Sequence, residues 1–171
     1  MSQATERQRF LARYGAIFEH SCWVAEEAFD QGLVRPGASG ADIHQAMCEV
    51  IRALPEARLL ALINTHPDLA GKLALAGEMT DDSHSEQSSA GLDRLTADEL
   101  ARFTALNDAY KARFGFVFIM AVRDKTKADI LAAFERRLQH DRQAEFATAL
   151  EEIFKITRMR IDRLGADEER P

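Results

Sequence analysis

Apolar residues recur at helical spacing along most of this chain, and this periodicity restricts its fold more than any other feature. Residues three or four positions apart lie on one face of an α-helix, so each such segment gains a face that it can bury. The pattern predicts an all-α, single-domain helical bundle of about eight to nine helices. To within a few residues at each end, the expected helices are 5–14, 16–31, 41–53, 56–65, 67–76, 84–93, 97–113, 127–139 and 142–164.

Three segments depart from this periodicity. Residues 116–122, with the sequence FVFIMAV, form a continuous apolar run whose composition is typical of a strand. Residues 32–40 are rich in Gly and Pro, and residues 77–85 are polar, but neither stretch is long enough to be a linker between domains. We therefore expect one domain with its core at about residues 10–164, followed by a charged, frayed tail at 165–171.

The composition argues against several classes of partner. The formal charge is −6, and acidic residues are interspersed among basic ones, which does not suit a nucleic-acid ligand. No apolar run approaches the roughly 20 residues of a membrane span, and the first residues lack the apolar core of a secretory signal. Two cysteines, Cys22 and Cys48, provide no disulfide framework. The expectation is a soluble cytoplasmic protein whose partner is a small molecule or another protein.

A histidine stands directly before a proline in Asn64-Thr65-His66-Pro67-Asp68. Proline suits the first turn of a helix and restricts the preceding residue to extended geometry. We therefore expect His66 at the N-terminal mouth of a helix that begins at Pro67, where the helix dipole disfavours the imidazolium form. A neutral imidazole suits a general base, but the same placement suits a structural histidine that bonds the neighbouring backbone. Both interpretations stay open on this pattern alone.

The segment Ser83-His84-Ser85-Glu86-Gln87 also has two interpretations. Ser83 and Glu86 have the spacing of a helix capping box, which would explain the glutamate without any function. The side chains of His84, Ser85 and Gln87 add polar groups that could bind a ligand or take part in catalysis. The same hydroxyl and carboxylate spacing occurs at three other expected helix starts, namely Ser39 with Asp42, Thr96 with Glu99 and Thr126 with Asp129.

An arginine falls on the apolar side of the last expected helix. Arg160 lies within that stripe, whereas Arg158 and Arg163 lie away from its centre. An inward guanidinium requires a partner, which is either a carboxylate of the protein or a polar substrate in a pocket. The stripe itself consists of Phe146, Leu150, Ile153, Thr157 and Leu164.

The sequence contains no common cofactor motif. His44 and Cys48 are four residues apart on an expected helix, but two ligands are too few for a structural zinc site, and no CxxC or HExxH motif supplies more. The patterns GxGxxG, GxxxxGK[ST] and GxSxG do not occur either. We expect no metal and no cofactor, so an enzyme built from this chain would rely on acid, base and hydrogen-bonding groups.

Together these segments resemble the 2-oxo-4-hydroxy-4-carboxy-5-ureidoimidazoline (OHCU) decarboxylase family, over about residues 10–164. Two departures from the family pattern are Cys22, where proline is expected, and Ile161, where leucine commonly follows the arginine. Neither departure falls at His66 or Glu86. Besides the histidine and glutamate segments, the matching motifs are Phe18-Glu19-His20-Ser21-x-Trp23-Val24-Ala25-Glu26, Ala90-Gly91-Leu92, Leu106-Asn107 with Tyr110, Phe114-Gly115-Phe116-Val117-Phe118-Ile119, and Lys155-Ile156-Thr157-Arg158-Met159-Arg160-Ile161.

The resemblance implies an all-α homodimeric enzyme that converts OHCU to (S)-allantoin and carbon dioxide in urate degradation, after the hydrolase that opens 5-hydroxyisourate. It implies that no cofactor is needed and that His66 and Glu86 are the catalytic pair. Backbone amides near Phe118 and Ile119 are expected to contact substrate oxygens. The substrate-binding residues that the resemblance implies are Pro67, Ser83, Gln87, Phe118, Ile119 and Arg160.

Two alternatives remain. The chain could be a non-catalytic interaction module, in which His66 and Glu86 only cap helices and the Phe-rich segment docks a partner. It could also be an enzyme of the same fold that acts on a related ureido acid.

Overall fold

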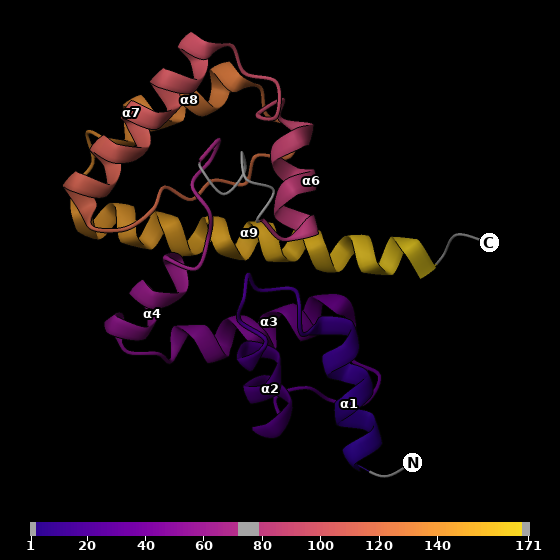
Figure 1. Ribbon diagram of the computed structural model, residues 1–171. Helices are drawn as coiled ribbons and strands as arrows, with labels where there is room; N and C mark the ends of the chain where they lie inside the picture. Colours follow the sequence, from indigo (N-terminus) through magenta and orange to yellow (C-terminus); the bar gives the residue numbers. More distant parts are fainter. Residues whose placement is uncertain (1–2, 72–78, 169–171) are drawn as a thin grey trace. The chain divides into compact units, whose positions relative to one another are not determined.

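The protein is all-α in the residues that the computed structural model describes, 3–71 and 79–168 (Figure 1). Those ranges contain eight helices and no strand, which confirms the predicted fold class. No helix in the same ranges combines the length and the apolarity needed to cross a bilayer. The helices are α1 (Gln3–Tyr14), α2 (Trp23–Asp30), α3 (Gly40–Arg52), α4 (Glu56–Ile63), α6 (Asp81–Ser89), α7 (Ala97–Phe114), α8 (Lys127–Arg137) and α9 (Arg142–Glu168).

The chain forms two compact units. The first comprises Met1–Thr65 together with Phe154–Pro171, and the second comprises His66–Ile153, so α9 contributes to both. In the first unit, α1 and α3 both contact α2, and the buried residues of α2 and α3 include Val24, Ala28, Ile43, Met47 and Ile51. In the second unit, α7 contacts α8 around an aromatic core of Phe103, Tyr110, Phe116, Phe118 and Phe134.

Local sequence signals determine several helix starts. Capping boxes of the predicted form begin α3, α7 and α8, because the hydroxyl of each N-cap residue accepts from the third backbone N–H and the carboxylate accepts from the N-cap N–H. α7 ends at Phe114 and is capped by Gly115, whose φ of 82° lies in the left-handed region that glycine adopts without a steric cost. The three confirmed boxes are Ser39 with Asp42, Thr96 with Glu99, and Thr126 with Asp129.

The helix expected over residues 16–31 begins only at Trp23. The chain turns at Gly15, where a Cβ atom would lie 2.6 Å from the carbonyl oxygen of Leu11, and again at His20, whose φ is 46°. Ile17 and Phe18 are nevertheless buried within this turn. Their apolar side chains therefore continue the helical pattern through residues that are not helical.

Residues 116–122 form neither a helix nor a strand, so the strand-like run pairs with no strand in the described part of the chain. Side chains, rather than a neighbouring strand, bind their backbone. The N–H of Ala121 donates to the Glu152 carboxylate at 2.8 Å, and Arg137 donates to the carbonyl of Ile119 at 2.7 Å. At the end of the chain, α9 continues four residues beyond the helix end expected at 164.

Candidate active site

The residues directly after His66 form a turn. Residues 67–71 are not helical, and residues 72–76 of the helix expected at 67–76 lie outside the described residues. Ala70 has φ 53°, a left-handed conformation that an α-helix cannot contain, and Gly71 N–H donates to the Asp68 carbonyl at 3.2 Å. The prediction that His66 stands at the mouth of a helix beginning at Pro67 is therefore wrong. The helix-dipole argument for a neutral imidazole does not apply.

His66 instead lines a groove of about 540 Å³ in the second unit. The imidazole is buried, with 7% of the residue exposed. Across the groove, α7 supplies polar side chains, and Lys111 Nζ forms an ion pair with Asp68 Oδ2 at 2.6 Å. A concave surface that combines a buried imidazole with a few polar groups suits a small polar ligand. Its lining includes His66, Pro67, Asp68, Thr104, Asn107 and Lys111.

Helix α6 carries Ser83, Glu86 and Gln87, and all three are buried. The helix begins three residues earlier than expected, because the Thr80 hydroxyl is the N-cap acceptor for the backbone N–H of Ser83. Asp81 and Asp82 follow in the first turn, where carboxylates interact favourably with the helix dipole. The interpretation of Ser83 and Glu86 as a capping box is therefore wrong. Capping does not account for the buried Glu86.

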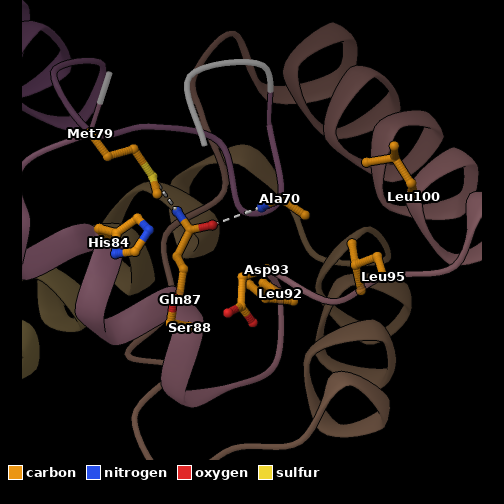
Figure 2. A pocket seen from close by; sticks show the side chains of 9 residues that line it. All are labelled: Ala70, Met79, His84, Gln87, Ser88, Leu92, Asp93, Leu95 and Leu100. Atoms are coloured by element: carbon orange, nitrogen blue, oxygen red, sulfur yellow. Dashed lines mark hydrogen bonds between the residues drawn. The ribbon is translucent and has the colours of Figure 1, made fainter. Parts of the chain in front are cut away.

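Gln87 connects α6 to the turn that follows His66. Its Oε1 accepts from the N–H of Ala70 at 2.9 Å, while its Nε2 donates to the Asp68 carbonyl at 3.4 Å and to the Met79 sulfur at 3.2 Å. Figure 2 shows the amide between Ala70 and Met79, beside a cavity of about 260 Å³ that His84 and Ser88 also line. The helix that carries Glu86 is thus bonded to residues two and four positions after His66.

Phe118 and Ile119 are held by a buried ionic cluster. The Arg137 guanidinium lies 4.3 Å from the ring centroid of Phe118 and donates to the carbonyl of Ile119. It also pairs with Glu145 at 2.9 Å, and Glu145 is completely buried. The Tyr110 hydroxyl donates to the same carboxylate. Burial is the largest cause that raises the pKa of Tyr110 above its ordinary value, and this hydrogen bond is the second. The cluster therefore holds Phe118 and Ile119 in place.

Arg160 lies in the first unit and points inward, as its position in the apolar stripe predicts. Its Nη1 donates to Glu19 Oε2 at 3.0 Å and to the Ile17 carbonyl at 3.2 Å. This is the internal salt bridge that the sequence left open as one alternative. A contact between Arg160 and a substrate stays a prediction.

His44 and Cys48, the weaker metal candidates, lie on α3. His44 Nε2 is 3.0 Å from the Phe154 carbonyl oxygen and 3.0 Å from the Thr157 hydroxyl, and burial lowers the pKa of this histidine. No group of three His, Cys, Asp or Glu residues with metal-binding geometry occurs within residues 3–71 and 79–168. Cys22 is exposed and Cys48 is buried, and no disulfide joins them.

Asn107 and Lys111 line the groove but were not among the site residues predicted from the sequence. Asn107 Nδ2 donates to the Leu69 carbonyl at 2.8 Å, and the residue is 3% exposed. A helical wheel would have indicated its burial, because Asn107 shares a face of α7 with Phe103, Tyr110 and Phe114. Its bond to a turn 38 residues away has no signal in the sequence.

Comparison with known proteins identifies relatives over almost the whole chain. The OHCU decarboxylase family model matches residues 3–162. The OHCU decarboxylase of Halalkalicoccus jeotgali is 39% identical over 93% of this chain and 86% of its own length. The uric acid degradation bifunctional protein of Bacillus subtilis is 44% identical over 91% of this chain and 30% of its own length. A crystal structure of (S)-allantoin synthase has a TM-score of 0.74 and 32% identity, covering 95% of this chain and 51% of that one.

These matches define an enzyme of the carboxy-lyase class, which releases carbon dioxide by breaking a carbon–carbon bond. The chain belongs to the OHCU decarboxylase family, which acts in urate degradation.

Proposed function

We propose that this chain converts OHCU to (S)-allantoin and carbon dioxide without a cofactor, with His66 and Glu86 as the acid-base pair. The observation that carries the proposal is a buried histidine on a groove, joined through Gln87 to the helix that carries a buried glutamate. Glu86 lies within α6 rather than at its N-terminus, where Thr80 is the N-cap, so helix capping is not its role. The substrate, OHCU, is inferred from the family to which the chain belongs.

The chemistry of the substrate suits a site built from side chains alone. The carboxylate of OHCU is attached to a carbon that bears a hydroxyl and adjoins a carbon–nitrogen double bond. When the carbon–carbon bond breaks, its electron pair passes into that double bond, and a proton is later returned to carbon. Pyridoxal and thiamine supply such an electron sink in other decarboxylases, whereas this substrate carries its own. The protein then has to position the substrate and move protons.

His66, oriented by Glu86, would remove the hydroxyl proton or handle the return of a proton to one face of the carbon. Delivery to a single face yields a single enantiomer. A positioned acid-base group contributes about 10² to 10⁴-fold to a rate. The remaining acceleration would come from orientation and from dipoles matched to the delocalised charge of the transition state.

The other predicted substrate contacts differ in charge, because Arg160 is a cation whereas Phe118 and Ile119 are apolar. An arginine paired with the departing carboxylate would stabilise the ground state more than the transition state, because that charge is lost as carbon dioxide forms. Arg160 would therefore bind an oxo or ureido oxygen, while Phe118 and Ile119 surround the carboxylate with apolar groups. A bound product analogue with its carboxylate against Arg160 would contradict this assignment. Contacts from Pro67, Ser83 and Gln87, a homodimeric assembly and a cytoplasmic location also stay predictions.

The decisive experiment adds purified protein to freshly generated OHCU and follows circular dichroism. We expect faster appearance of (S)-allantoin than in the spontaneous reaction, which has no chiral catalyst. An unchanged rate would contradict decarboxylase activity and favour the interaction module. Faster turnover of a related ureido acid under the same conditions would instead change the substrate.

A further inference from the structure

The turn after His66 adopts a conformation that its own residues disfavour. Ala70 has a positive φ, which is uncommon for a residue other than glycine. Gly71 is tightly packed, since a Cβ atom there would lie 2.5 Å from Asp68 Cβ. Strained backbone of this kind persists where the surrounding structure holds it in place. The supporting contacts of this turn therefore determine the direction in which the chain leaves His66.

Three side chains from two helices bind this turn. Gln87 of α6 accepts from the N–H of Ala70, and Lys111 of α7 pairs with the Asp68 carboxylate. Asn107, one helical turn before Lys111, donates to the carbonyl of Leu69. Of the two contacts from α7, only that of Asn107 reaches the backbone.

The hydrogen bond to Leu69 also determines the orientation of the Asn107 amide. A carbonyl oxygen only accepts, so the amide atom that faces Leu69 must be the nitrogen. Asn107 Oδ1 is buried and has no hydrogen-bond partner among the described residues. The contribution of this side chain to the turn is therefore a single N–H donor.

We propose that Asn107 is a positioning residue for catalysis, which acts through Leu69 and the turn to hold His66 in its productive orientation. This inference rests on the proposed function. Asn107 and His66 line the same groove, and only Pro67 and Asp68 separate His66 from the bonded Leu69. A misplacement of about 1 Å at a catalytic group can cost on the order of 10²-fold in rate. Loss of the donor should therefore affect kcat more than KM.

Two substitutions test the donor. N107L is similar in size but cannot donate, and we expect kcat to fall by roughly tenfold to a hundredfold, with a small change in KM.

N107D can donate only while the introduced carboxyl is protonated, and burial raises the pKa of a carboxyl. Its kcat relative to the wild type should therefore be highest at about pH 5 and fall toward about pH 8. Dividing the kcat of N107D by that of the wild type at each pH cancels effects that both proteins share. Such effects could come from the other ionisable residues of the groove, which are Asp68, Asp108, Lys111 and His66.

Matched controls introduce the same two side chains, Leu and Asp, at Ala109 on the exposed side of α7. A109L and A109D should leave kcat and its pH profile unchanged, because Ala109 is exposed. Hydrogen exchange of the Ala70 amide provides a structural readout, since this N–H of the turn donates to the Gln87 side chain of α6. We expect faster exchange in N107L and wild-type exchange in A109L.

The outcomes separate the two proposals. A folded N107L with wild-type kcat would overturn the positioning role, as would a loss of kcat without faster Ala70 exchange. If N107L does not fold, N107D decides alone, and a ratio that does not change between about pH 5 and 8 overturns the role. A wild-type protein without turnover contradicts the proposed function instead.

Discussion

Arg160 Nη1 lies 3.0 Å from Oε2 of Glu19, and the two residues are 3% and 1% exposed. Removing one partner of a buried ion pair leaves the other charge uncompensated. We therefore predict that R160M lowers the free energy of unfolding by about 3–5 kcal/mol in urea denaturation. R158M is the control, because Arg158 forms an exposed pair with Asp162 and should contribute about 0.5 kcal/mol or less. Equal losses in the two variants would contradict a structural role for the Arg160 pair.

For His66 we predict loss of turnover without loss of structure. H66N keeps a polar side chain of similar size but has no group that titrates near neutral pH, so kcat should fall by about 10² to 10⁴-fold. Far-ultraviolet circular dichroism and thermal melting should match the wild type. Unfolding that accompanied the loss of activity would favour the structural interpretation of this histidine.

Substitution of Glu86 separates catalysis from helix capping. E86Q preserves hydrogen-bonding capacity but removes the charge, and we expect kcat to fall strongly. The capping variant of the same helix is T80A, which should lower the free energy of unfolding by about 1 kcal/mol. An E86Q protein that lost only stability, like T80A, would indicate a structural glutamate.

His44 should make the stability of the protein depend on pH. Burial lowers its pKa in the folded state, so the unfolded chain binds a proton more readily. The stabilisation is complete above the ordinary value of 6.5 and is lost as pH falls through the lowered folded-state pKa. We predict that H44Q reduces the loss of stability between about pH 7.5 and 5 in urea denaturation. Identical pH dependence in the two proteins would exclude this linkage.

The Arg137 cluster should stabilise the segment that contains Phe118 and Ile119. R137M leaves Glu145 buried without its guanidinium and removes the donor to the Ile119 carbonyl. We expect the free energy of unfolding to fall by about 3–5 kcal/mol. R136M, at an exposed neighbouring position, should change it by about 0.5 kcal/mol or less. Comparable stability in the two variants would show that the cluster is not a main support of the segment.

The parts of the fold that were predictable depend on local sequence. Thr96 and Glu99 form a capping box because both groups belong to one helical turn, so their spacing alone predicts the helix start. The turn after His66 was not predictable, since nothing in the sequence marks Ala70 for a left-handed conformation. That conformation depends on Gln87 and Asn107, whose contacts are distant in sequence.

The candidate site was predictable to a similar extent. The residue types around His66 and Glu86 made both residues candidates for a site, and their catalytic assignment came from the resemblance to the family. Glu19 appeared only within a matching motif, because its role depends on a partner 141 residues away. Asn107 likewise appeared only within a matching motif, because its hydrogen bond reaches a residue 38 positions away. Residues that act through long-range contacts require a structure to be recognised.

The apolar run at residues 116–122 has a consequence for solubility. Arg137 donates to the carbonyl of Ile119 and Glu152 accepts from the N–H of Ala121, and no strand among the described residues pairs with this run. Uncharged segments of about six or seven residues with high β-propensity are prone to cross-β aggregation when they are exposed. Local opening of this region would expose such a segment to other molecules. We therefore expect the contacts of Arg137 and Glu152, which hold this run in the folded chain, to lower its tendency to aggregate.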